Sequence, residues 1–332
     1  MKLKAMAQDT NLTVYCTIFD DNYLARAIVL YESLMRVNHR AVFAFFCIDA
    51  NTVRLLTALN LERAVIVGHE EFATPELLAV RPLRSQGEYC WTCKPVALLH
   101  LMRAIPKAAW VAYVDTDMMF FGDPDEALPG PDVHYLLAPH RFHTSFSEFE
   151  HSAGKHNAGY VASRCTEQGE RVISWWRDRC IERCSGIPTS DTFADQKYLD
   201  QMEDLFPFGA AAHHIGLNVA PWNVENFIVS SNAGHVFVDD VPLLLFHFQG
   251  LQLFDNGTAS LYIGDMRINE TLRVNVYEPH LTALLLGFKR LRKIDPQFAR
   301  GLGAQRKYLG SFVKRALRTI TKRANVVPFK IA

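Results

Sequence analysis

Long apolar segments are absent from this sequence. Its 332 residues contain no run of about 18 or more apolar residues, the length that a transmembrane helix needs. The opening residues, MKLKAMAQDT, also lack an apolar stretch long enough for a secretory signal. We therefore expect a cytoplasmic protein.

The cysteine pattern argues against a zinc site, and the lack of glycine near the N-terminus argues against one kind of phosphate-binding loop. Seven cysteines are an odd number, which favours reduced thiols, and the single pair Cys90 and Cys93 has no second CxxC to complete a zinc site. Residues 12–24 contain no glycine. That absence excludes the glycine-rich phosphate loop of a sugar-nucleotide pyrophosphorylase.

Acidic residues are nearly absent from the end of the chain. The whole sequence has 35 residues of each charge, but residues 285–332 hold 13 Lys and Arg against one acid, Asp295. The other 284 residues carry 22 basic and 34 acidic residues. This asymmetry indicates a basic attachment segment on an acidic body.

Residues 302–323 predict an amphipathic helix with a basic polar face. Apolar residues recur there at helical spacings, at Leu302, Leu309, Phe312, Val313, Leu317 and Ile320. Three interpretations of this helix are open. Its apolar stripe could pack on the acidic body, the helix could lie on the anionic inner face of the cell membrane, or its positive charge could bind nucleic acid. We expect no nucleic-acid partner, because no recognised nucleic-acid module accompanies the charge.

The first 140 residues alternate apolar segments with helical patterns, which predicts βα units and a mostly parallel sheet. We expect a single α/β Rossmann-like domain over residues 12–270 and a basic helical extension over 271–332. The expected strands are 13–19, 41–48, 64–68, 110–114, 133–139, 157–163 and 241–250. The expected helices follow residue 20, span 94–104 with Pro95 in the first turn, span 167–184, and begin near 191 with Thr192 and Asp195 as a capping pair.

Two carboxylates follow the strand expected at 110–114. Asp115 and Asp117 are two residues apart, so at a strand end both side chains point the same way. Carboxylate oxygens suit Mg²⁺ or Mn²⁺, and solvated turn acids are the alternative. His247 ends the apolar segment LLLFHFQG, where it is either packed in the core or a further metal ligand, and Gly250 suggests close approach of the backbone to another group.

Six short motifs follow one another along roughly residues 12–255. They are FDDNY at 19–23, DTD at 115–117, HNAGYV at 156–161, ADQKYLD at 194–200, APWN at 220–223 and HFQG at 247–250. In this order they resemble the motifs of family 8 glycosyltransferases, and more closely those of bacterial nucleotide-diphospho-sugar transferases of that type. Ordered motifs are far more specific than an isolated DxD.

The resemblance implies a GT-A fold and a metal-dependent glycosyltransferase. Such an enzyme moves a sugar from a nucleotide-diphosphate donor, here expected to be a UDP-sugar, to a saccharide or to a lipid-linked saccharide (a glycolipid), with retention of the anomeric configuration. An acceptor on a lipid would place the enzyme peripherally on the inner face of the cell membrane.

The resemblance also implies roles for individual residues. Asp20, Asn22 and Tyr23 correspond to residues that hold the nucleobase and ribose, Lys94 and Gly250 to donor-binding residues, and Asp115, Asp117 and His247 to ligands of Mn²⁺ or Mg²⁺. Asn157 corresponds to a residue beside the donor sugar, and Asp195 and Gln196 to the pair beneath its anomeric carbon. Each also has a structural interpretation: Asn22 or Asp195 as a helix cap, Tyr23 as a core residue, Gly159 as a turn.

One position departs from the family's pattern. The last motif usually continues as His-x-x-Gly-x-x-Lys, in which the lysine neutralises the donor diphosphate, but here the position is Leu253. Either Lys94, Lys155 or Lys197 supplies that charge, or the closing segment is arranged differently. The alternative functions are a haloacid-dehalogenase-like phosphatase, whose strand also ends in DxD, and a non-catalytic sugar-nucleotide-binding protein.

Overall fold

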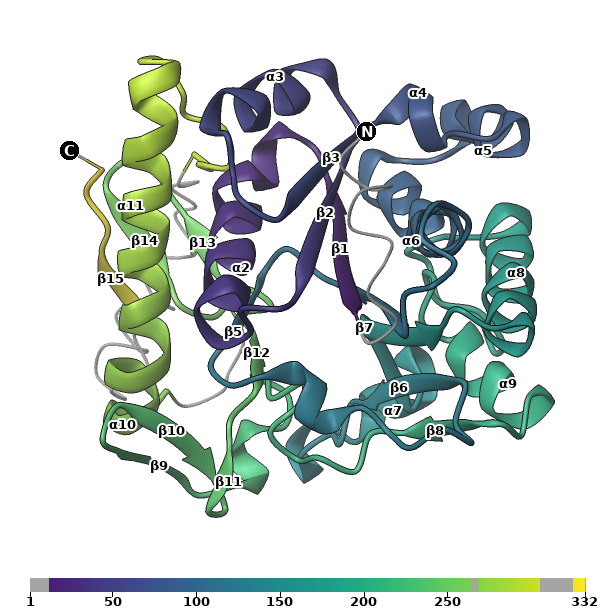
Figure 1. The fold of residues 1–332 in the computed structure, drawn as a ribbon. Helices are drawn as coiled ribbons and strands as arrows, with labels where there is room; N and C mark the ends of the chain where they lie inside the picture. Colours follow the sequence, from purple (N-terminus) through teal and green to yellow (C-terminus); the bar gives the residue numbers. More distant parts are fainter. Residues whose placement is uncertain (1–11, 264–267, 305–324, 332) are drawn as a thin grey trace.

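A seven-stranded sheet lies at the centre of the computed structural model, which describes residues 12–263, 268–304 and 325–331 (Figure 1). Its strands, in spatial order, are β3 (Ala64–Gly68), β2 (Val42–Cys47), β1 (Thr13–Phe19), β4 (Trp110–Val114), β7 (His156–Arg164), β6 (Tyr135–Pro139) and β8 (Gly209–Ala211). Only β7 runs antiparallel to both of its neighbours. The α/β class and the mixed, mostly parallel sheet are therefore confirmed.

Helices cover both faces of this sheet. They are α2 (Leu24–Val37), α3 (Ala50–Leu59), α4 (His69–Phe72), α5 (Pro75–Val80), α6 (Gln86–Ala104), α7 (Glu148–Ala153), α8 (Glu167–Glu182), α9 (Tyr198–Leu205), α10 (Glu270–Leu272) and α11 (Glu278–Ile294). Single turns lie at Asp21–Tyr23, Arg81–Leu83, Pro124–Ala127, Thr144–Phe146 and Val224–Asn226, and Arg273–Tyr277 forms a π-helical turn before α11.

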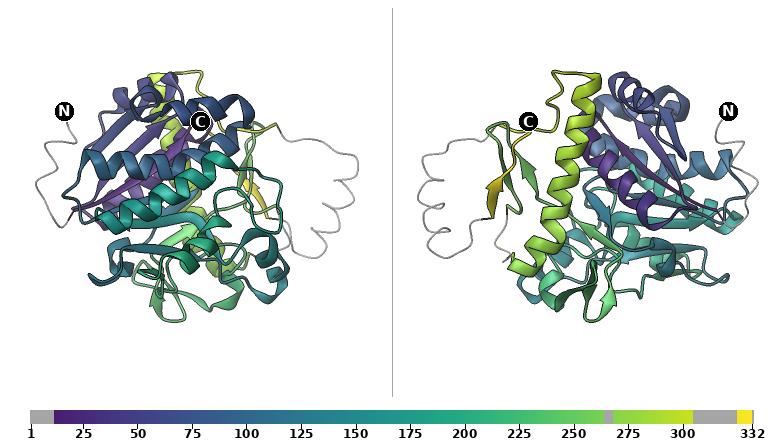
Figure 2. Two further views of the ribbon diagram at one scale, coloured as in Figure 1. Left: turned by 90° about the vertical axis from the view of Figure 1, so that its right-hand side faces the viewer. Right: turned by 60° about the vertical axis from the view of Figure 1, so that its left-hand side comes forward.

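The alternation of side chains along β1 divides the core into two layers. Tyr15 and Phe19 belong to the apolar cluster that includes α2 and α11, whereas Cys16 and Ile18 belong to the cluster of α6 and α8. Figures 1 and 2 show α2 and α11 side by side on one side of the sheet, with α6 and α8 on the other. Because every second residue faces each helical layer, the strand is buried along its whole length.

Three short sheets accompany the central sheet in the described part of the chain. β5 (Met118–Phe120) pairs with β12 (Leu245–His247), and β9 (Val229–Asn232), β10 (His235–Val238) and β11 (Val241–Pro242) form a meander. The third sheet contains β13 (Gln252–Leu253), β14 (Thr258–Ser260) and β15 (Val326–Pro328). The single strand expected at 241–250 is therefore wrong: β11 pairs with β10, and β12 separately pairs with β5 and ends at His247.

Two helix predictions also need correction. The helix expected at 94–104 begins at Gln86, because Ser85 and Glu88 form a capping box ahead of it, and Pro95 lies in its interior. The helix expected near 191 begins only at Tyr198. Asp195 is not its capping residue, since its buried side chain pairs with Lys94 instead.

The helical pattern beyond residue 270 is partly seen in α10 and α11. Leu284, Phe288 and Leu291 of α11 are buried in the same cluster as α2. The amphipathic helix predicted at 302–323 falls almost wholly outside the described residues. Within the described ranges, none of the helices combines the length and apolar character needed to span a membrane.

Candidate functional site

A large cleft lies where β1, β4 and β12 end. Its volume is about 1730 Å³, and all eleven residues assigned a site role from the sequence line it. They are Asp20, Asn22, Tyr23, Lys94, Asp115, Asp117, Asn157, Asp195, Gln196, His247 and Gly250. The fold therefore brings together residues that are spread over more than two thirds of the chain.

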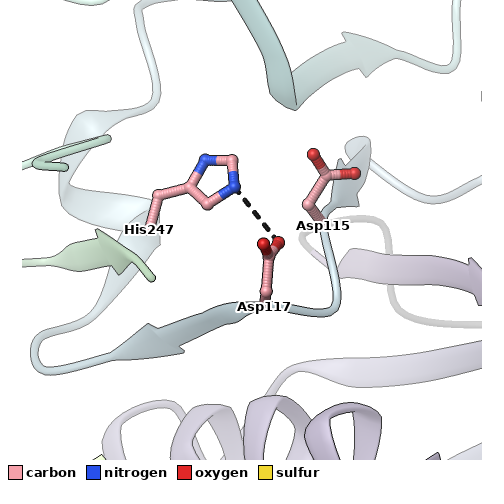
Figure 3. Close-up of side chains that lie close together, drawn as sticks. All are labelled: Asp115, Asp117 and His247. Carbon is pink, nitrogen blue, oxygen red and sulfur yellow. Dashed lines mark ion pairs between the residues drawn. The ribbon is translucent and has the colours of Figure 1, made fainter. Parts of the chain in front are cut away.

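Asp115, Asp117 and His247, which we name the metal-binding group, line the main cleft, and Figure 3 shows their side chains close together. One potential ligand atom of each lies within 4.8 Å of the others, and His247 Nε2 is 3.1 Å from Asp117 Oδ1. The Asp115 amide donates to the carbonyl of Gly159 at 2.8 Å, and the Phe248 amide donates to the carbonyl of Asp117 at 2.8 Å. The first bond fixes Asp115 against β7, and the second fixes Asp117 against the residue that follows β12, so the three side chains converge.

The donor set and charges of this group fit a divalent cation. Burial lowers the pKa of His247, but the adjacent Asp117 carboxylate more than reverses this, so the pKa is raised above its ordinary value. The imidazole Nδ1 is buried and finds no hydrogen-bond partner among the described residues, while Nε2 faces the carboxylates. Two carboxylates and one imidazole nitrogen are suitable ligands for Mn²⁺ or Mg²⁺.

Lys94 connects the metal-binding group to Asp195. Its ammonium lies 3.0 Å from Asp115 Oδ1 and 3.2 Å from Asp195 Oδ2, and it donates to the carbonyl of Ala158 at 3.2 Å. Burial raises the pKa of Asp195 to about 6 even though Lys94 lowers it. One ammonium thus serves two carboxylates, which leaves one negative charge uncompensated.

A divalent cation would remove this excess of negative charge. Asp115, Asp117 and Asp195 are three acids, and Lys94 is the one ammonium in contact with them among the described residues. With His247 neutral, a bound dication brings the sum of these charges to zero. Because uncompensated buried charge is costly, this balance supports a metal at the group.

Asn157 and Gln196 also line the main cleft and are hydrogen-bonded to each other. The Asn157 amide donates to Gln196 Oε1 at 3.3 Å, and its own Oδ1 accepts from the Gly159 amide at 3.0 Å. A Cβ on Gly159 would come within 2.5 Å of Asn157 Oδ1 and 3.1 Å of His247 Cε1. Gly159 lies inside β7, so it permits close packing of the site rather than a turn.

Asp20, Asn22 and Tyr23, which follow β1, line the main cleft. Asp20, not Asn22, caps the short turn, because its carboxylate accepts from the Asn22 amide at 3.0 Å. Tyr23 is 45% exposed, so it is not a core residue, and its ring is free on one side to stack on a planar group.

The sequence patterns assign no individual role to two residues that support the site, Tyr113 and Trp222. The Tyr113 hydroxyl donates to Asp115 Oδ1 at 2.9 Å, and its position two residues before that aspartate on one strand face was an available signal. Trp222 packs edge-on against His247, with ring centroids 5.1 Å apart. Its partner is 25 positions away, so only the fold reveals this contact.

The lysines expected to replace the missing lysine at 253 are differently placed. Lys94 faces two carboxylates. Lys197 donates to the carbonyls of His151 and Thr189, and neither it nor Lys155 lines the main cleft. The expectation is therefore wrong for Lys197 and Lys155, and Lys94 is already paired with acids.

Comparisons with known proteins agree with this fold. No family model matches the chain. Among solved structures, the galactosyltransferase LgtC, in complex with donor and acceptor sugar analogues, aligns with a TM-score of 0.52 and 17% identity over 82% of this chain and 95% of LgtC. An active-site mutant of LgtC aligns with a TM-score of 0.50 and 16% identity over 78% of this chain and 93% of that chain. The GT-A type of fold is thus confirmed.

Two curated proteins of Bacillus subtilis (strain 168) are similar along most of their length. The uncharacterized protein YfnF is 28% identical over 297 residues, which is 86% of this chain and 96% of YfnF. The uncharacterized protein YfnD is 31% identical over 291 residues, which is 86% of this chain and 93% of YfnD. At that identity and coverage, the chain belongs to the same family as YfnD.

Proposed function

We propose that this protein is a metal-dependent, family 8-like glycosyltransferase that uses a nucleotide-diphosphate sugar, most simply a UDP-sugar. The observation that carries the proposal is the convergence of Asp115, Asp117 and His247 in a cleft of about 1730 Å³ that Asp195 and Gln196 also line. A dication at the group would offset the charge that develops on the leaving nucleoside diphosphate.

The donor would lie along the main cleft. Its base and ribose would contact Tyr23, Asp20 and Asn22, with the Tyr23 ring stacked on the base. Its sugar would lie near Asn157 and Gln196, whose amides are hydrogen-bonded to each other. This orientation places the diphosphate beside Asp115 and Asp117.

Asp195 and Gln196 would stabilise positive charge on the reacting sugar. The Asp195 carboxylate is buried, and its backbone carbonyl accepts from Trp176 Nε1 at 2.8 Å, so its position is fixed. An oriented carboxylate in a site of low polarity stabilises a developing cation strongly. We propose that the acceptor hydroxyl bonds to the anomeric carbon on the face where the bond to the diphosphate breaks, with retention, and that its proton passes to the departing diphosphate.

The acceptor would be a saccharide or a lipid-linked saccharide. The main cleft also carries exposed or half-buried aromatic rings, including Phe142, Phe146 and Phe149. Such rings pack well against the apolar faces of sugar rings. The basic residues of 285–332 would bring the protein to an anionic membrane that carries a lipid-linked acceptor.

A screen of nucleotide sugars for Mn²⁺-dependent hydrolysis tests the proposal. We expect one donor to be hydrolysed by the wild type and not by Asp117→Ala, with Asp178→Ala on the exposed face of α8 as a control. A donor that binds but is neither hydrolysed nor transferred would indicate a non-catalytic binding protein. Hydrolysis by Asp117→Ala at the wild-type rate would refute the metal site.

A further inference from the structure

A second cavity opens beside the metal-binding group. It has a volume of about 600 Å³ and shares Asn22, Tyr23, Asp117 and Gly250 with the main cleft. Leu253, the position at which a lysine is missing, also lines this side cavity. The two cavities therefore meet at Asp117, next to the place where the donor diphosphate is proposed to lie.

Arg26 supplies the positive charge of the side cavity. Its residue exposure is 8%, and its guanidinium lies over the Tyr23 ring, 5.2 Å from the centroid. One weak hydrogen bond joins Nη2 to the carbonyl of Leu251 at 3.4 Å. Within the described ranges it forms no ion pair with a carboxylate, and Lys94 is the other lysine or arginine that lines either cavity.

Burial lowers the pKa of Arg26, and the nearby Asp117 carboxylate offsets only part of this effect, so a bound anion would stabilise the guanidinium further. Arg26 lies in the first turn of α2, where the helix dipole already presents partial positive charge. Burying a guanidinium there without a carboxylate partner adds a desolvation cost. Both costs fall when an anion occupies the cavity, because the guanidinium fork and the helix dipole then act on it together.

We propose that Arg26 binds the diphosphate of the donor nucleotide from the side cavity, and so takes the role that the resemblance assigns to a lysine at 253. The inference rests on the proposed function, which supplies the nucleotide. A dication balances the acids of the site but leaves the donor diphosphate unneutralised. Arg26 is the buried cation placed to neutralise it, and its planar fork suits phosphate oxygens.

The test measures the affinity of UDP, UMP and uridine at saturating Mn²⁺ for the wild type and for Arg26→Gln. We expect Arg26→Gln to weaken UDP binding about 10- to 100-fold, as loss of a charge-assisted bond does, to weaken UMP less, and to leave uridine unchanged. Arg36→Gln is the matched control, because Arg36 also lies on α2 and also donates to one carbonyl, that of Phe120.

A variant that moves the positive charge from position 26 to position 253 in the side cavity makes the test specific. Leu253→Lys in the Arg26→Gln background should restore most of the UDP affinity, since both positions line the same cavity. Arg26→Lys, which keeps the charge without the fork, should fall between wild type and Arg26→Gln. Far-UV circular dichroism and urea unfolding check that each variant is folded. If Arg26→Gln does not fold, the affinities of Arg26→Lys are compared with those of the wild type instead.

Three outcomes would overturn the inference. The first is wild-type UDP affinity in the Arg26 variants, and the second is an equal loss for uridine and UDP, which would mean that Arg26 acts by positioning the Tyr23 ring. The third is a wild type that binds no nucleoside diphosphate with Mn²⁺, whatever the base. Only the third also refutes the proposed function, so the two failures are distinguishable.

Discussion

Asp195 is expected to destabilise the metal-free protein at neutral pH, and Asp195→Asn should remove that cost. The side chain is 2% exposed, and burial raises its pKa to about 6 despite the ammonium of Lys94 at 3.2 Å. An aspartate in an unfolded chain titrates near about 3.9. The folded state therefore holds a proton at this carboxyl more tightly than the unfolded state does.

The size of the effect follows from the difference between the two pKa values. A gap of about two units corresponds to about 3 kcal/mol in the free energy of unfolding. Because the folded pKa is the higher one, this stabilisation is fully present below about pH 3.9 and is lost as the pH rises through about 6. Asparagine does not ionise, so Asp195→Asn should exceed the wild type by up to about 3 kcal/mol at about pH 7.5 and lose this advantage toward about pH 4.

Urea unfolding at both pH values, with EDTA present, measures this prediction. The control is Asp178→Asn, which removes an exposed acid paired with Arg177 and should change stability by less than about 0.5 kcal/mol. The same Asp195→Asn variant should lose donor hydrolysis, because a group that lowers the stability of the fold is often retained for its function. An advantage no larger at neutral pH than at acid pH would refute the reasoning, because the Lys94 pair would then outweigh desolvation.

The remaining changes address the metal-binding group and the basic segment. His247→Ala should weaken Mn²⁺ affinity about 10- to 100-fold; an unchanged metal titration would mean that the imidazole only packs. Gly159→Ala should also weaken Mn²⁺ binding, since the added Cβ would lie 3.1 Å from His247 Cε1, whereas Gly130→Ala, which meets no atom within 4 Å, should not; equal affinity in both variants would contradict the packing argument. Replacing the seven basic residues of 306–323 by serine should reduce co-sedimentation with anionic vesicles at low salt, and no reduction would exclude that segment as the attachment site.

Motifs predicted the site better than they predicted the elements that hold it. The sequence predicts Asp115 and Asp117 from their DxD spacing after an apolar strand, and His247 from its place at the end of another apolar segment. The capping box of Ser85 and Glu88 is also present in the sequence, but Pro95 favours a helix start at 94, because proline in a helix interior normally costs about 3 kcal/mol.

Contacts between distant residues were beyond sequence reasoning. The Lys94–Asp195 pair joins the middle of α6 to the segment before α9, and it forms only because α6 and α8 pack on the same face of the sheet. The pairing of β12 with β5 likewise depends on the path of the chain between Phe120 and Leu245, not on local pattern. The sequence does not predict a role for Arg26, because an arginine near the start of a helix is normally exposed to solvent.

The charges of the two cavities predict that metal and donor bind cooperatively. Without metal, the acids around Lys94 leave an excess of negative charge beside Asp117, and a diphosphate there would be repelled even with Arg26 close by. Binding of a dication removes that repulsion, and thermodynamic linkage requires the diphosphate to raise metal affinity by the same factor. We therefore expect UDP affinity to fall at least about 10-fold in EDTA and Mn²⁺ affinity to rise by an equal factor with UDP, both measured by calorimetry. The uridine affinity should change little in EDTA, because uridine brings no charge to the acids. Equal UDP affinity with and without metal would show that the carboxylates of this group do not face the diphosphate.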